Sequence, residues 1–104
     1  MIKHIVLFKP AEHADADDIS AVLAGLATLS DKLEGASQFR AGACLTEDPV
    51  SRGYSRGFTI EFEGPQALQT YLDHPTHKQL GAQLLAVTQG GIEGLLVMDL
   101  KCPD

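Results

Sequence analysis

Cysteine is scarce in this chain. Among its 104 residues there are only Cys44 and Cys102, and they do not form a C-x-x-C pair. Small secreted domains that depend on disulfides carry more cysteines than this, so we expect no disulfide scaffold. Met1 leads directly into an apolar stretch that reads as a strand and not as a signal peptide. We therefore expect reduced thiols and a cytoplasmic location.

The chain also lacks long apolar runs and an excess of basic residues. No run approaches the ~20 residues that cross a bilayer, so we expect no membrane partner. The net charge is −6, from 14 acidic and 8 basic residues. A compact acidic domain repels phosphate backbones, which argues against nucleic-acid binding. No phosphate-binding loop, dinucleotide fingerprint or Ser-His-Asp pattern is visible, and we expect no cofactor.

The chain does contain the composition of a globular domain and a regular sequence of strand and helix patterns. Hydrophobic residues make up 44% and charged residues 21%, which fits one packed domain over residues 1–104. The predicted elements are a strand at 2–9, a helix between the N-cap Asp15 and the C-cap Gly35, strands at 36–45 and 57–63, helices starting at Pro65 and Pro75, and a strand at 94–100. This order predicts an α+β fold, the ferredoxin-like βαββαβ sandwich with a four-stranded antiparallel sheet.

The first and last predicted strands carry apolar residues on both faces. In a ferredoxin-like sandwich the helices cover only one face of the sheet. The other face would expose Ile5 and Leu7, together with either the pair Leu96 and Met98 or the pair Leu95 and Val97. An exposed apolar patch of this kind usually marks an interface. We therefore predict a homodimer whose two sheets meet face to face.

Candidate chemistry is concentrated in the stretch from Tyr71 to His77. His74 and His77 flank Pro75 near a predicted helix start, where the helix dipole disfavours a protonated imidazole. A neutral histidine can accept a proton, and Tyr71 can supply a phenolic donor. Together in a cavity they would suffice for acid–base chemistry on an enolisable carbonyl compound. The alternative is that His74 caps the helix while His77 and Tyr71 bond to the backbone.

His4 is the other histidine of interest, because it shares a strand face with apolar side chains and would point toward the same region. A metal site could be assembled from His4, His74, His77 and Asp73. These residue types can bind metal, but no H-x-x-x-H or H-E-x-x-H spacing is present. We therefore expect no metal.

Several segments resemble the stress-responsive α/β-barrel (Dabb) family. They are residues 1–9, 53–55, 62–63, 67–77 and 96–99, and together they span nearly the whole chain. The Tyr-x-x-His-Pro-x-His segment from Tyr71 to His77 is the most specific of them.

This resemblance implies a dimeric α/β barrel in which each subunit gives one four-stranded sheet. The family includes plant stress proteins, bacterial members of unknown role and a plant polyketide cyclase that needs no cofactor. The catalytic tyrosine and histidine of that cyclase match Tyr71 and His77, and two histidines at its cavity match His4 and His74. A further cavity histidine is replaced by Arg56. Aromatic cavity residues of the first helix are replaced by Val22, Leu23 and Leu26, so the resemblance does not imply the same substrate.

The sequence therefore predicts a small apolar cavity between sheet and helices. Its predicted lining is Val6, Phe8, Leu23, Leu26, Phe58 and Tyr71, with His4, His74 and His77 as polar groups. In an enzyme His77 would be the general base and Tyr71 the donor, in a cofactor-free cyclase, isomerase or lyase step on an apolar or aromatic, polyketide-like molecule. The alternatives are a non-enzymatic stress or ligand-binding protein and a relative of the dimeric monooxygenases.

Overall fold

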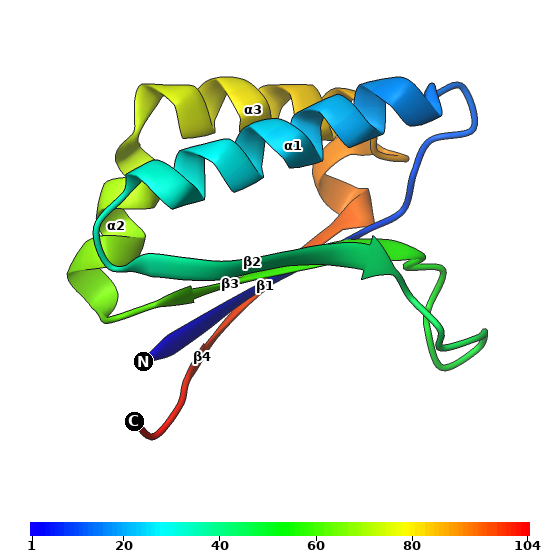
Figure 1. Cartoon of the computed structure of the whole chain (residues 1–104). Helices are drawn as coiled ribbons and strands as arrows, with labels where there is room; N and C mark the ends of the chain where they lie inside the picture. The colour runs from blue at the N-terminus through cyan, green and yellow to red at the C-terminus, as the bar shows by residue number, and fades with distance from the viewer.

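The computed structural model describes residues 1–104 as an antiparallel sheet with helices on one face (Figure 1). The elements are β1 (Ile2–Phe8), α1 (Ala16–Lys32), β2 (Ala36–Ala43), β3 (Arg56–Phe62), α2 (Pro65–Asp73), α3 (Pro75–Ala86), the 3₁₀ turn η1 (Gly91–Gly94) and β4 (Leu95–Lys101). The four strands lie in the order β2-β3-β1-β4. The predicted ferredoxin-like α+β fold is confirmed. None of the helices is both long and apolar enough to span a bilayer.

Helix α1 begins where the sequence predicts and ends earlier. The Asp15 carboxylate accepts a hydrogen bond from the Asp17 N–H at 2.8 Å, so Asp15 is the N-cap. The helix stops at Lys32 with Leu33 as its C-cap, whereas the sequence predicts Gly35 there. Gly35 instead has φ +82° in the turn into β2. A glycine is required in this turn because a β-carbon there would lie 2.8 Å from the Ala67 side chain.

Helices α2 and α3 are separated at the predicted position. His74 is the C-cap of α2 and the N-cap of α3, with an extended backbone (ψ 133°) that suits the residue before a proline. Its ring Nδ1 accepts a hydrogen bond from the Thr76 N–H at 3.1 Å. Pro75 occupies the first turn of α3, where a missing N–H costs nothing.

Strand β2 is less regular than the other strands. Its pairing with β3 shifts register between Ser37 and Arg40, and Gln38 there has a positive φ of 57°. The strand ends at Ala43 instead of the predicted residue 45. A bulge of this kind interrupts the period-two pattern, which explains why the sequence signal is weak here.

The strand register decides which residues face away from the helices. Ile5 lies directly opposite Met98, and Leu7 lies opposite Leu96. Directly paired residues share a face of the sheet, so the pair Leu96 and Met98, of the two predicted alternatives, lies with Ile5 and Leu7. Met98 is 52% exposed, and no helix covers this side (Figure 1). We call this surface the bare face: Ile5, Leu7, Leu96, Met98 and Leu100.

Candidate functional site

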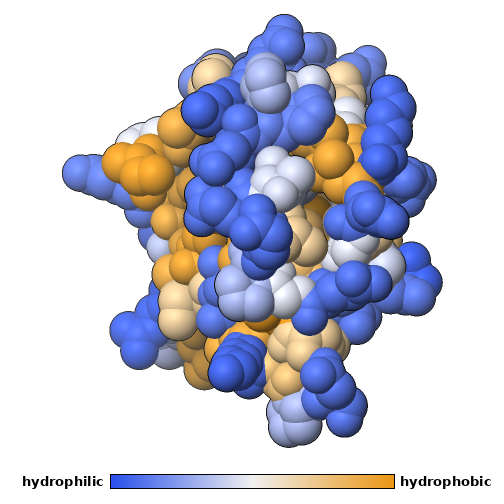
Figure 2. Space-filling model, turned by 90° about the vertical axis from the view of Figure 1, so that its left-hand side faces the viewer, coloured by the Kyte–Doolittle hydropathy of each residue, from blue (hydrophilic) through white to orange (hydrophobic).

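A cavity of about 430 Å³ lies on the helix side of the sheet, between α3 and strands β1 and β4. This volume is within the range of small-molecule sites. The lining is mainly aliphatic and comprises His4, Val6, Leu26, Phe58, Leu72, His77, Lys78, Gly81, Ala82, Leu84, Leu85, Leu95 and Val97. Figure 2 views the end of the molecule that carries α2 and the chain termini, and hydrophobic surface reaches the outside between hydrophilic side chains there.

His4 is the buried polar group on the sheet side of the cavity. Strand alternation points it toward the helices with Val6, and only 3% of it is exposed. Its ring Nδ1 lies 2.6 Å from Oδ1 of Asp99, which the register places directly opposite on β4. The His4 ring packs against the rings of Phe58, Phe62 and Tyr71. A carboxylate at Nδ1 orients the imidazole and leaves Nε2 free to act.

Tyr71 lies between the two cavity histidines. Its ring centroid is 5.8 Å from that of His4 and 4.5 Å from that of His77. The residue is completely buried, and its hydroxyl has no hydrogen-bond partner. Burial raises the pKa of Tyr71, so the phenol stays protonated at neutral pH. It is therefore an unused donor in an apolar surrounding.

His77 is in the first turn of α3 and lines the cavity directly. Its Nδ1 atom is buried without a hydrogen-bond partner. Burial lowers the pKa of His77, and the charges of His4 and His74 lower it further, while the Leu72 carbonyl acts in the opposite direction. The imidazole is consequently neutral at neutral pH and able to accept a proton.

The structure brings most of the predicted cavity residues together. His4, Val6, Leu26, Phe58 and His77 all line the cavity, and Tyr71 lies behind its wall, in ring contact with both histidines.

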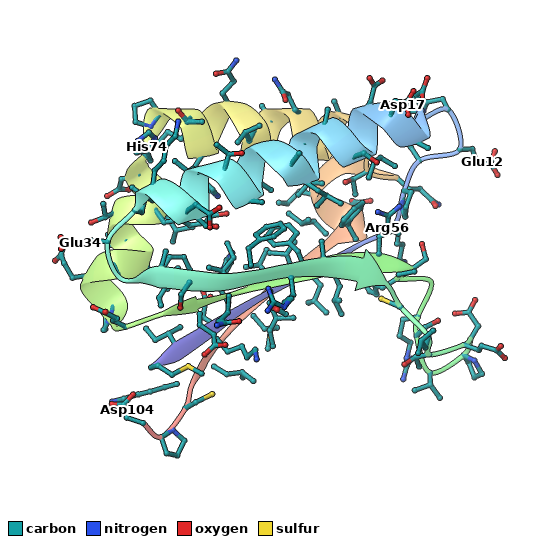
Figure 3. All side chains as sticks on the ribbon, in the orientation of Figure 1. Glu12, Asp17, Glu34, Arg56, His74 and Asp104 are labelled. Carbon is teal, nitrogen blue, oxygen red and sulfur yellow. The ribbon has the colours of Figure 1, made fainter.

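The remaining predicted residues lie elsewhere. Phe8 and Leu23 are buried in the core and do not line the cavity. His74 caps α3 at the α2–α3 junction, on the outside of the helical layer (Figure 3). Figure 3 places Arg56 at the opposite end, between sheet and helices, and it does not line the cavity either. The capping role proposed as the alternative for His74 is thus present, whereas the Tyr71 hydroxyl makes no backbone bond.

Sequence reasoning missed Asp99 and Lys78. Asp99 was detectable as the one acidic residue in the otherwise apolar run from Leu95 to Leu100, but its pairing with His4 follows from strand register. Lys78 follows His77 and faces the cavity from the same helical turn. The possible metal set does not assemble, because no three histidine, cysteine, aspartate or glutamate side chains converge.

Comparison with known proteins identifies the family and agrees with the fold. The family model for the stress responsive A/B barrel domain (Dabb) matches residues 2–102. The stress-response A/B barrel domain-containing protein HS1 of Arabidopsis thaliana is 26% identical over 100 residues, which are 96% of this chain and 88% of HS1.

Two solved structures illustrate the range of similarity. A dimeric ferredoxin-like protein of unknown function from Jannaschia sp. CCS1 is 34% identical, with a TM-score of 0.90, covering 97% of this chain and 98% of that one. The hydroxynitrile lyase of Passiflora edulis is 13% identical, with a TM-score of 0.82, covering 99% and 94%. At that identity the lyase shows a shared fold alone.

Proposed function

Because the chain belongs to the stress responsive A/B barrel domain family, as its sequence resemblance indicated, we propose that it is a homodimer in which each subunit binds a small apolar molecule. The bare face supports the dimer. It leaves Leu96, Met98 and Leu100 between 38% and 52% exposed on one surface, and hydrophobic burial favours covering such a patch. The similar protein from Jannaschia is itself described as dimeric.

The cavity supports the ligand. Its aliphatic walls would bury an apolar body, and its polar groups are gathered where α3 begins and His4 lies. The Tyr71 hydroxyl and the Nδ1 atom of His77 are both buried without a partner, on rings whose centroids are 4.5 Å apart, and this is the observation that carries the proposal. A buried polar group without a partner costs on the order of 1–3 kcal/mol. A polar atom of a ligand reaching between the two histidines would remove that cost.

We further propose acid–base chemistry at this point. His77 takes a proton from a carbon next to a carbonyl group, and Tyr71 donates a hydrogen bond to the oxygen on which negative charge develops. Asp99 bonds Nδ1 of His4, which leaves the other ring nitrogen of this lining residue free. A cyclisation, isomerisation or lyase step of this kind uses only side chains of the chain.

Binding without turnover is the second candidate, and one observation favours it. Tyr71 is fully buried behind the cavity wall, so the donor reaches a ligand only if the ligand enters between the His4 and His77 rings. A protein that merely binds an apolar metabolite requires no such entry.

The two candidates are separated by a ligand screen followed by turnover assays. Thermal-shift screening of small carbonyl compounds identifies binders, and each binder is then tested for conversion by the wild type, His77→Ala and Tyr71→Phe. Conversion that both substitutions abolish supports the acid–base function. Binding without conversion, unchanged by His77→Ala, supports the second candidate. Sedimentation of the wild type at micromolar concentration tests the dimer, and a monomer of 11.1 kDa would refute it.

A further inference from the structure

We propose that the cavity selects ligands that carry an ionised carboxylate on an apolar body, with the carboxylate against the Lys78 ammonium. This inference rests on the proposed function, since it requires the cavity to bind a small molecule. It goes further by naming the chemical class of that molecule.

The charge of the lining points to this class. The chain has 14 acidic and 8 basic residues, yet no carboxylate lines the cavity. Three ionisable side chains do line it: His4, His77 and Lys78. His77 is held neutral by burial, so Lys78 supplies a full positive charge at neutral pH. An acidic protein thus has a cavity whose lining includes a lysine and no carboxylate.

The position of Lys78 suits a ligand that lies partly in solvent. Lys78 lines the cavity and is also an exposed residue, so its side chain contacts both the cavity and water. It lies in the first turn of α3, a helix of 12 residues with no acidic residue in that turn. The Lys78 side chain forms no salt bridge within 4.0 Å. No carboxylate of the chain therefore pairs directly with this cation.

A single lysine fits a monoanion better than a phosphate. Phosphate groups are typically bound by several donors, often an arginine fork, and the lining contains no arginine. The remaining walls, such as Leu26, Leu72, Leu84 and Val97, match a hydrocarbon or aromatic body. An apolar monocarboxylate matches both the hydrophobic walls and the single lysine.

Binding of three probes with the same apolar chain tests the inference. Octanoate, octanamide and octylamine are titrated into the wild type by calorimetry at neutral pH and low salt. We expect octanoate to bind about fivefold more tightly than octanamide, the upper range for a solvent-exposed ion pair, and octylamine to bind most weakly. The preference for octanoate should become smaller at high salt, because dissolved ions screen the attraction between the carboxylate and Lys78.

Four variants locate the effect. Lys78→Met should remove the octanoate preference, and Lys78→Arg should keep it. Lys32→Met changes the net charge equally at a residue outside the cavity, and should keep it too. Gly81→Leu adds a side chain to a lining position where a β-carbon meets nothing within 4 Å, and should weaken all three probes. Leucine is also a better helix former than glycine, so this variant should fold.

The outcomes are distinct. Equal binding of octanoate and octanamide, or a preference that survives Lys78→Met, overturns the carboxylate inference and leaves the proposed ligand-binding function standing. Probe binding that Gly81→Leu does not weaken places the probes outside the cavity and overturns the inference. A failure of all three probes to bind overturns the inference and counts against the proposed function as well.

Discussion

Nδ1 of His4 lies 2.6 Å from Oδ1 of Asp99, across the β1–β4 pair, with His4 buried and Asp99 at 36% side-chain exposure. The distance is that of a short, charge-assisted hydrogen bond. A carboxylate has no proton to give at neutral pH, so the imidazole donates from Nδ1–H. The antiparallel register therefore fixes the tautomer of a buried histidine at the edge of the cavity.

Replacing Asp99 by asparagine should change that tautomer. The asparagine amide can donate to Nδ1, which would move the ring proton to Nε2, so Nε2 would become a donor. Long-range proton–nitrogen NMR of the histidine rings measures this directly. Asp73→Asn, at an exposed position whose carboxylate accepts from Gln69, is the matched control. A wild-type His4 ring that carries its proton on Nε2 alone would contradict the assignment.

His77 should make the protein less stable as the pH falls. Its pKa is lowered from 6.5 in the folded state, chiefly by burial. As the pH falls below about 6.5, the unfolded chain takes up a proton that the folded chain does not. The free energy of unfolding should therefore decrease from pH 7.5 to pH 5.5, by at most about 1.4 kcal/mol per pH unit from this residue.

Urea unfolding of the wild type and His77→Gln at both pH values isolates that contribution. The variant should lose less stability on acidification than the wild type. His13→Gln, at an exposed position before α1, is the control. It should lose as much stability on acidification as the wild type. If His77→Gln and the wild type lose equal stability, the histidine is not buried as a neutral ring.

Tyr71→Phe should leave the ligand-free protein as stable as the wild type, or make it up to about 1 kcal/mol more stable. The substitution removes a buried hydroxyl that has no partner, whose desolvation costs on the order of 1–3 kcal/mol. The ring contacts with His4, Phe62 and His77 remain. Chemical unfolding measures the difference.

Tyr71→Ala is the contrasting variant, because it also removes the ring and should cost about 3–5 kcal/mol. Under the proposed function Tyr71→Phe would lose turnover without losing stability. A clear destabilisation of Tyr71→Phe would show that the hydroxyl is already bonded within the fold.

Met98→Glu should separate the proposed dimer. Met98 pairs with Ile5 at the bare face, and two facing copies would bring like charges into an apolar contact. Sedimentation should give a mass near 11.1 kDa for the variant. Ile92→Glu, at a position 69% exposed in η1 and outside the bare face, adds the same charge and should remain associated. Dissociation of both variants would point to net charge as the cause.

The fold follows closely from the sequence, because its signals are local. The period of α1, the Asp15 cap and the Pro75 break each act over a few residues, and each is where the sequence predicts. The bulge in β2 was not predictable, since it depends on how β2 pairs with β3.

The sequence predicts the kinds of residue at the site better than it predicts where each of them lies. Alternation along β1 places His4, Val6 and Phe8 on the helix side, but does not say which of them meets a cavity and which meets only the core. His74 and His77 have the same chemistry, and the capping of α3 separates their roles. Asp99 and His4 are 95 residues apart, and only the β1–β4 register joins them.

Strand β4 shows how two properties can be encoded in seven consecutive residues. Leu95 and Val97 line the cavity and Asp99 holds His4, while Leu96, Met98 and Leu100 form the bare face. Successive side chains of a strand point to opposite faces of the sheet, so neighbours in sequence contribute to different surfaces. A substitution at Val97 reshapes the cavity without altering the bare face, and one at Met98 does the reverse. Substitutions at neighbouring positions of this strand can therefore change ligand selectivity and chain association independently of each other.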